Sequence, residues 1–124
     1  MILGVHHATF LCRDLARSRA FYEGVLGLHS DPARPQMSFD GVWYNLAHGQ
    51  QIHLMQLPDP GAGLTRPAHG GRDRHVAFVV SNLADLKHAL EAAAITCRMS
   101  QSGRRALFCH DPDQNALEFI EAMA

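Results

Sequence analysis

The sequence predicts an α+β protein built from two tandem modules, each a strand followed by a helix and three further strands. The first observation is an internal repeat: residues 7–15 resemble residues 75–83, with Phe10 and Phe78 in register 68 positions apart. The second is that helical spacing, and then three short strand candidates, follow both copies of the repeat. A repeated order of elements within 124 residues indicates two copies of one small module.

Each copy of the repeat predicts a strand followed by the start of a helix. A histidine is followed by five mostly apolar residues, which suits a short buried strand, and then by one polar residue. Asp14 and Asn82 come next and suit the N-cap of a helix, because their side chains can accept hydrogen bonds from the amides of the first turn.

Small and apolar residues recur at intervals of three and four after each cap, which predicts one helix per module. In the first module Gly27 stands where the helix should end, and the recurring positions are Leu15, Ser18, Phe21 with Tyr22, and Val25 with Leu26. In the second module Asn82 and Asp85 resemble a capping box, and no glycine marks the helix end. The recurring positions there are Leu83, Leu86, Leu90, and Ala93 with Ala94.

Three strand candidates follow each helix, and a connector separates the modules. The candidates span about residues 29–35, 42–47 and 51–57 in the first module, and 95–99, 105–110 and 116–121 in the second. Residues 58–73 are rich in proline and glycine, which indicates a connector. We therefore predict a single domain over residues 1–124, with module one at about 1–58, the connector at about 58–73 and module two at about 74–124.

Composition and charge exclude several classes of protein. The 11 basic and 12 acidic side chains give a formal net charge of −1, so neither nucleic acid nor a membrane surface is an expected partner. No apolar run approaches the ~20 residues that span a bilayer, and the N-terminus does not resemble a signal peptide. Three cysteines cannot all pair within the chain and match no metal-binding spacing. These features are typical of a reduced, cytoplasmic protein.

Strand alternation separates a few of the nine histidines from the rest. Alternate strand residues share a face, so Ala8, Phe10 and Cys12 should face the helix of the first module. His7 then lies on the opposite face, and His75 takes the equivalent place in the second module. Histidine at matching inward positions of both modules favours metal ligation over a structural role.

The last strand of each module offers a second matching pair. If Ile52 corresponds to Leu117, then His53 corresponds to Glu118. A carboxylate inside a buried strand needs a partner, because an unpaired buried charge is very costly. Three roles for His53 stay open at this point: a fourth ligand, a general base, or a structural core residue.

A two-fold arrangement of the modules would bring these four side chains towards one cavity. Imidazole and carboxylate are ligands for Zn²⁺, Fe²⁺, Ni²⁺ and Mn²⁺, and two histidines with one carboxylate leave positions open for substrate. The predicted metal ligands are His7, His53, His75 and Glu118.

Two further features of the sequence have both a functional and a structural interpretation. Arg104 and Arg105 follow Gly103, where they would either neutralise an anionic substrate or serve as ordinary surface charges. Trp43 and Tyr44 lie on opposite faces of one predicted strand, so one would line the cavity while the other packs in the core.

Three motifs cover nearly the whole chain. The first is HATFLCRDLARSRAFYEGVLGL at residues 7–28, the second is RDRHVAF at 72–78, and the third is FCHDPDQNALEF at 108–119. Together they resemble the vicinal oxygen chelate superfamily, which includes glyoxalase I, the fosfomycin and bleomycin resistance proteins and the extradiol dioxygenases. The resemblance implies two βαβββ modules that form a cupped mixed sheet around a divalent metal ion, in a homodimer.

The resemblance also implies a site and an activity. It places metal ligands at His7, His75 and Glu118, whereas glyoxalase I usually has a glutamate where this chain has His53. The expected activity is Lewis-acid catalysis on a small substrate with vicinal oxygens, as a lyase, isomerase or resistance-type transferase, with Glu118 and His53 as catalytic residues. The alternatives are an Fe(II) ring-cleaving dioxygenase and a metal-free, bleomycin resistance-like protein that binds an antibiotic.

Overall fold

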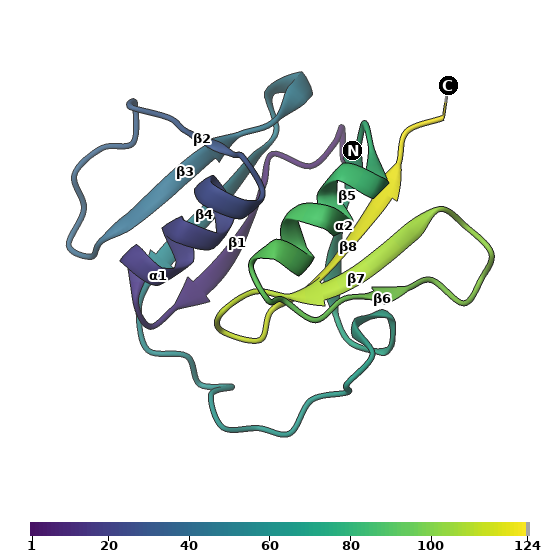
Figure 1. The fold of residues 1–124 in the computed structure, drawn as a ribbon. Helices are drawn as coiled ribbons and strands as arrows, with labels where there is room; N and C mark the ends of the chain where they lie inside the picture. Colours follow the sequence, from purple (N-terminus) through teal and green to yellow (C-terminus); the bar gives the residue numbers. More distant parts are fainter. Residues whose placement is uncertain (124) are drawn as a thin grey trace. The chain divides into compact units, whose positions relative to one another are not determined.

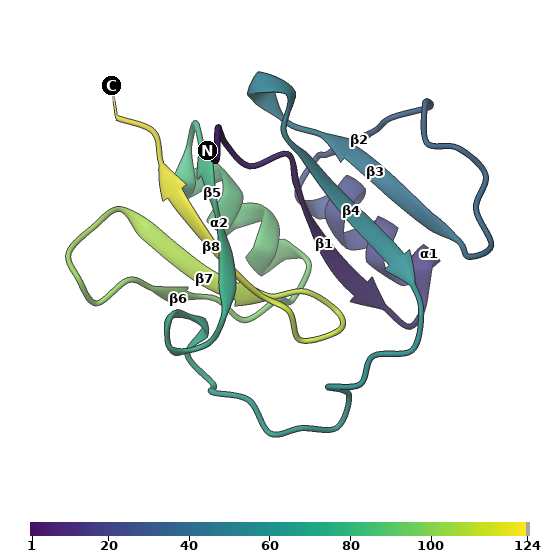
Figure 2. The same cartoon turned by 180° about the vertical axis from the view of Figure 1, so that it is seen from behind.

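The computed structural model describes residues 1–123 and divides into two compact units (Figure 1). Unit 1 comprises Met1–Ala62 and unit 2 comprises Gly63–Ala124. Each unit contains one four-stranded sheet with a helix on one face, as the two opposite views show (Figures 1 and 2). The predicted α+β class and its two βαβββ-like modules are confirmed.

Unit 1 has the strand order β1-β4-β3-β2, in which β1 is parallel to β4 and the other neighbours are antiparallel. Its elements are β1 (His7–Cys12), α1 (Leu15–Arg19), the π-helical segment η1 (Ala20–Val25), β2 (His29–Ser30), β3 (Gly41–Asn45), the 3₁₀ turn η2 (Ala47–Gly49) and β4 (Gln51–Gln56).

Unit 2 repeats this topology with the order β5-β8-β7-β6, in which β5 is parallel to β8. Its elements are the 3₁₀ turn η3 (Gly70–Arg72), β5 (His75–Val80), α2 (Leu83–Ala92), β6 (Arg98–Met99), β7 (Ala106–His110) and β8 (Ala116–Glu121). In both units the strand that bears the predicted carboxylate or imidazole donor, β8 or β4, is therefore an inner strand.

The strand register makes the two units equivalent at the predicted site. In unit 1 His7 pairs with Gln51, so His53 lies two residues further along β4. In unit 2 His75 pairs with Ala116, so Glu118 lies two residues further along β8. The predicted correspondence of His53 with Glu118 therefore matches the observed pairing of the strands.

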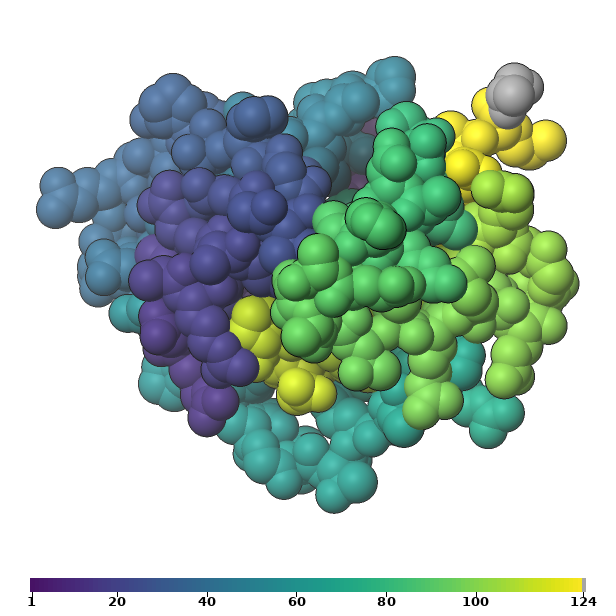
Figure 3. All heavy atoms as spheres, viewed as in Figure 1, coloured from purple at the N-terminus to yellow at the C-terminus, as the bar shows by residue number. Residues whose placement is uncertain are grey.

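Both helices begin at the predicted caps. The Asp14 side chain accepts a hydrogen bond from the Arg17 amide at 3.2 Å, and that of Asn82 accepts one from the Asp85 amide at 3.0 Å. Each cap satisfies an amide that the first helical turn leaves without a partner. The outer faces of both helices, α1 in purple and α2 in green, form part of the surface shown in Figure 3.

The first helix ends before Gly27, as predicted, and the second ends without a glycine. The first helix changes from α-helical to π-helical geometry at Ala20, and Gly27 follows it with a φ of 74°. After the second helix Ala94 adopts the left-handed conformation, with a φ of 58°, that a glycine would adopt without strain.

Aromatic residues fill the core of unit 1. Tyr22 is fully buried between Phe10 and Tyr44, with ring centroids 6.1 Å and 5.9 Å away. The Tyr44 hydroxyl donates a 2.8 Å hydrogen bond to Glu23, which also pairs with Arg19. Tyr44 is therefore the packing member of the predicted Trp43–Tyr44 pair.

Two predicted strands are much shorter than expected. The candidate at 29–35 forms only the two-residue strand β2, and the candidate at 95–99 forms only β6. Both are edge strands, where pairing on one side alone sets the length of regular structure. Within unit 2, ahead of β5, Arg66 donates two hydrogen bonds of 2.8 Å and 2.7 Å to the Asp73 carboxylate. Within the described residues, no helix has the length and apolar character needed to cross a bilayer.

Candidate functional site

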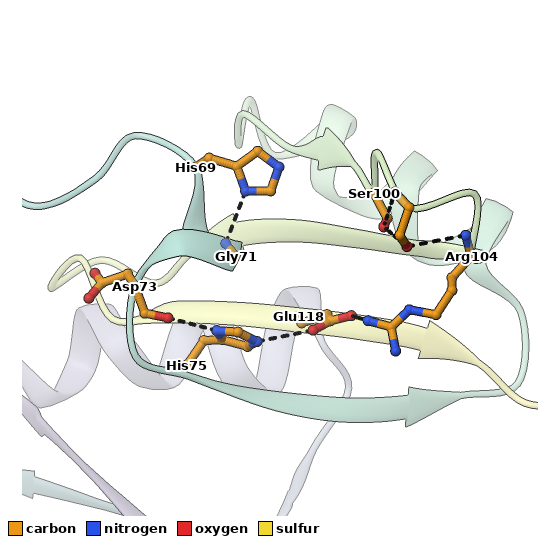
Figure 4. A network of polar contacts seen from close by, with 8 residues as sticks. His69, Gly71, Asp73, His75, Ser100, Arg104 and Glu118 are labelled. Atoms are coloured by element: carbon orange, nitrogen blue, oxygen red, sulfur yellow. Dashed lines mark hydrogen bonds and ion pairs between the residues drawn. The ribbon is translucent and has the colours of Figure 1, made fainter.

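In unit 2 the predicted donors His75 and Glu118 contact each other. His75 opens β5, and its Nε2 lies 3.0 Å from Oε1 of Glu118 on the neighbouring strand β8 (Figure 4). The Glu118 residue is only 3% exposed. The structure thus places a carboxylate inside the sheet and sets an imidazole directly against it.

The main-chain carbonyl of Asp73 fixes the tautomer of His75. That oxygen lies 2.8 Å from Nδ1, and a carbonyl oxygen can only accept a hydrogen bond, so Nδ1 must carry a proton. The lone pair of a neutral His75 is then on Nε2, facing Glu118. Because two acceptors cannot form a hydrogen bond, the contact needs a further proton on the imidazole or on the carboxyl group.

A divalent cation fits in place of this proton. With the proton removed, the pair presents an imidazole lone pair and a carboxylate, which are donors that Zn²⁺, Mn²⁺ and Fe²⁺ accept. The Asp73 carbonyl supports this use, since metal-binding histidines ordinarily donate their second N–H to an oxygen. The residues present therefore fit the metal ion that the sequence motifs imply.

Arg104 occupies the second oxygen of Glu118. Its Nη2 donates a 2.9 Å hydrogen bond to Oε2, so both carboxylate oxygens have a partner (Figure 4). Arg104 lies in the loop between β6 and β7, after Gly103. The adjacent Arg105 instead pairs with Glu121, outside this cluster.

In unit 1 His53 is enclosed by a stack of aromatic rings. The His7 ring lies 4.0 Å from it at an interplanar angle of 12°, and the Trp43 ring lies 4.5 Å from it at 8°. These two residues come from β1 and β3, the strands on either side of β4, so they cover opposite faces of the imidazole. Trp43 is thus the member of the Trp43–Tyr44 pair that lies beside a predicted donor.

Burial and nearby charge keep His53 neutral. Desolvation is the largest of the effects that together lower its pKa to about 4, and the charges of His7, His6 and Arg34 are the smaller ones. A neutral imidazole has one protonated and one unprotonated ring nitrogen, so the hydrogen bonds around His53 decide which one is available.

Gln51 decides that question. Its Nε2 donates to Asp31 at 2.9 Å and to Asn45 at 2.8 Å, which identifies that atom as the amide nitrogen. Its Oε1 lies 2.9 Å from Nε2 of His53 and can only accept. His53 therefore carries its proton on Nε2, and the lone pair is on Nδ1.

Sequence reasoning did not identify Gln51 as a site residue. The signal was present, because Gln51 lies two residues before His53 and so shares its face of β4. His6, which precedes β1, contacts its neighbour: the Nδ1 atoms of His6 and His7 lie 2.8 Å apart.

The structure therefore brings the four predicted donors together as two pairs, one within each unit. Across residues 1–123, no group of three or more His, Cys, Asp and Glu side chains is assembled in metal-binding geometry. His7 and His53 form the pair in unit 1, and His75 and Glu118 form the pair in unit 2.

Comparison with known protein families identifies the family of this chain. The family model described as the glyoxalase/bleomycin resistance protein/dioxygenase superfamily matches residues 4–119. The chain belongs to this superfamily. The resemblance expected from the sequence motifs is confirmed.

Individual relatives span most of the chain. It is 31% identical over 127 residues to the uncharacterised protein YwkD of Bacillus subtilis, covering 98% of both chains. It is 29% identical over 122 residues to a protein named Glyoxylase I 4 from Arabidopsis thaliana, covering 94% of this chain and 70% of that one.

Solved structures share the fold. A protein of Bacillus anthracis assigned to the glyoxalase family aligns with a TM-score of 0.75 at 24% identity, over 99% of this chain and 98% of that one. The fosfomycin resistance protein FosX of Listeria monocytogenes aligns with a TM-score of 0.75 at 18% identity, over 99% and 95% of the two chains.

Proposed function

We propose that this chain is a divalent-metal-dependent enzyme that acts on a small substrate with two adjacent oxygen atoms. One observation carries the proposal: in each unit the first-strand histidine meets the donor at the matching position of the last parallel strand. A structural role for one histidine would not explain the same arrangement in both copies of the module.

His7, His75 and Glu118 are the proposed metal ligands, and His53 is either a fourth ligand or a general base. The bound ion would act as a Lewis acid that stabilises negative charge developing on a substrate oxygen. These donors are soft enough for Zn²⁺ and Fe²⁺ and also accept Mn²⁺ and Ni²⁺.

The protein's own groups orient these side chains. Asp73 keeps the His75 proton on Nδ1 and leaves Nε2 as the donor atom. Gln51 keeps the His53 proton on Nε2, so Nδ1 is the atom that would bind an ion or accept a substrate proton. Trp43 and His7 stack on both faces of His53, which restricts its rotation and keeps water from the ring.

The names of relatives support the substrate class. A mutant of Listeria FosX forms a crystalline complex with Mn(II) and 1S,2S-dihydroxypropylphosphonic acid, a compound with hydroxyl groups on adjacent carbons. The bovine mitochondrial methylmalonyl-CoA epimerase is 26% identical over 118 residues, covering 88% of this chain and 67% of that one. Together with the plant protein named Glyoxylase I 4, these relatives favour lyase, isomerase or transferase chemistry for this chain.

The proposal also extends to assembly and location. We propose a homodimer, as the resemblance to the superfamily implies, and expect light scattering in solution to give twice the chain mass. Cys12, Cys97 and Cys109 are all thiols in the structure, which supports a reducing, cytoplasmic compartment.

Metal analysis of protein purified without chelators tests the proposal. We expect stoichiometric divalent metal in the wild type and at least about tenfold weaker metal binding in His7→Ala and Glu118→Gln, since even second-layer partners of metal ligands contribute that much. His88→Ala is the matched control, because His88 is exposed on α2. Two results together would favour the metal-free antibiotic-binding alternative. The wild-type protein would contain no stoichiometric metal, and His7→Ala would leave its thermal stability unchanged.

A second measurement separates the two enzymatic alternatives. Protein loaded with Fe²⁺ under anaerobic conditions is mixed with catechol and then exposed to oxygen. The proposed lyase, isomerase or transferase consumes no oxygen in this assay. Oxygen uptake that requires Glu118 would instead assign a ring-cleaving dioxygenase.

A further inference from the structure

We propose that Arg104 is an internal counter-cation that neutralises Glu118 in the metal-free protein and releases it when a divalent ion binds. The inference rests on the proposed function, because it takes Glu118 as a metal ligand. It assigns a role to a residue that touches the candidate ligand without itself being able to bind a metal, since guanidinium has no lone pair to donate.

Glu118 is costly to bury as an unpaired carboxylate. Its side chain is only 4% exposed, and burying an ionised carboxylate is costly unless it is paired and hydrogen-bonded. Oε1 contacts His75 and Oε2 accepts the 2.9 Å hydrogen bond from Arg104. In the absence of metal, Arg104 therefore supplies the permanent positive charge that this carboxylate needs.

Binding of a divalent ion would change the charge balance around Glu118. An ion bound by His75 and Glu118 would bring two positive charges to the carboxylate that Arg104 also contacts. With Arg104 still in place, three positive charges would face the single negative charge of Glu118. The ion and the guanidinium would bind the two oxygens of one carboxylate. Like charges so close together repel strongly in a partly buried site, so the metal-bound state favours departure of the guanidinium.

Arg104 can move away from Glu118 into solvent. Its side chain is 59% exposed, whereas its partner is 4% exposed. It extends from a loop in which Gly103 has a φ of 84°, and its own amide bonds Ser102 weakly at 3.4 Å. A solvated guanidinium on such a loop loses little when its ion pair breaks, because water takes the place of the carboxylate.

Arg105 provides a matched control. It is the next residue in the chain, has the same charge and also forms a carboxylate ion pair, but with Glu121 rather than Glu118. Its side chain is 72% exposed. Arg105→Gln therefore removes the same charge from the same loop without freeing the proposed ligand.

Calorimetric titration with Mn²⁺ after removal of bound metal tests the proposal. We expect Arg104→Gln to bind Mn²⁺ about tenfold more tightly than the wild type, equivalent to about 1.4 kcal/mol. Arg105→Gln should stay within about twofold of the wild type, and Arg104→Lys, which keeps the charge, should also resemble it. Equal affinities in Arg104→Gln and Arg105→Gln overturn the proposal, as does weaker binding in Arg104→Gln, which would make Arg104 a support for the metal-bound carboxylate.

Thermal unfolding gives an independent measurement. Without metal, Arg104→Gln should melt at a lower temperature than Arg105→Gln, because it leaves a buried carboxylate short of a cation. Saturating Mn²⁺ should remove the difference between Arg104→Gln and the wild type. A difference in melting temperature between Arg104→Gln and the wild type that persists with saturating Mn²⁺ would contradict the release of Glu118 by Arg104. If neither the wild type nor any variant binds metal, the proposed function fails, and this inference fails with it.

Discussion

His53 and Glu118 occupy equivalent positions in the two units, on β4 and β8, but need different surroundings. The buried carboxylate of Glu118 is held by a histidine and an arginine, both of which can supply positive charge. The imidazole of His53 stays neutral, and two aromatic rings cover it instead. The chemistry of the side chain at this position thus determines whether charged or aromatic neighbours accompany it.

At this scale we predict that Gln51 sets the tautomer of His53. In Gln51→Leu the acceptor for the Nε2 proton is lost, so nitrogen-15 NMR of the side chain should show a mixture of both neutral tautomers. In the wild type we expect the Nε2–H form alone, because the Gln51 amide nitrogen is already committed to Asp31 and Asn45.

Gln50→Leu is the control for this substitution, since Gln50 is the exposed neighbour of Gln51 at the end of the η2 turn. It should leave the tautomer unchanged. A wild-type spectrum with the His53 proton on Nδ1 would contradict the assignment of this hydrogen-bond chain.

At the scale of elements, the sequence predicts the strands that carry the site better than it predicts the short strands β2 and β6. The predicted strand at 116–121 and the strands opening at His7 and His75 match the structure closely. β8 is an inner strand, and β1 and β5 are edge strands that begin at the repeated histidine pattern. β2 and β6 are edge strands of two residues each and carry no such pattern. Apolar alternation indicates which face is buried but gives no measure of how far an edge strand continues to pair.

The predicted donors could be selected from the sequence, whereas the groups that contact them could not. Strand alternation and the repeat were sufficient to select His7, His53, His75 and Glu118 as candidates. They gave no indication that Asp73 contributes through its main-chain carbonyl, because any residue has that group. The contact of Arg104 with Glu118 was also beyond prediction, since it depends on the path of a loop between two strands.

The two helix ends give a prediction about stability. Gly27 adopts a φ of 74° after the first helix, whereas Ala94 adopts 58° after the second. A residue with a Cβ atom is strained by about 1 kcal/mol in this conformation, and glycine is not. Ala94→Gly should therefore raise the free energy of unfolding by several tenths of a kcal/mol, measured by urea denaturation, once the greater freedom of glycine in the unfolded chain is subtracted.

Gly27→Ala is the reciprocal change and should lower the stability by about half a kcal/mol, because the strain of the Cβ atom exceeds the gain from a less flexible unfolded chain. Gly24→Ala is the control, because a Cβ atom there meets nothing within 4 Å and the residue lies within the π-helical segment at negative φ. A destabilised Ala94→Gly would show that Ala94 relieves its strain through contacts beyond backbone geometry.

At the scale of the whole molecule, duplication gives each unit two of the four proposed metal donors. Two donors bind a divalent ion less firmly than three or four. Because the proposed ligand set includes residues of both units, the proposed function predicts that metal binding is linked to the folding of each unit.

Each unit contains a buried thiol that can report its opening. Cys12 lies in unit 1 and Cys109 in unit 2, and both are 2% exposed. Burial is the main cause that raises the pKa of the Cys109 thiol to about 12, with smaller contributions from Cys97 and Asp111. Because the thiolate is the reactive form, Cys109 should react with an alkylating reagent only when its unit opens.

We predict that Mn²⁺ slows alkylation of both buried thiols. At a free concentration 100 times the dissociation constant, linkage stabilises the folded state by about 2.7 kcal/mol, which is roughly a 100-fold decrease in the open population. Mass spectrometry of labelled peptides should show this decrease at Cys12 and at Cys109, while the half-buried Cys97 reacts at an unchanged rate. Mn²⁺ suits the test because it prefers oxygen and nitrogen ligands to thiolate. Protection of Cys109 without Cys12 would mean that unit 1 contributes no ligand, and the proposed role of His7 would then be wrong.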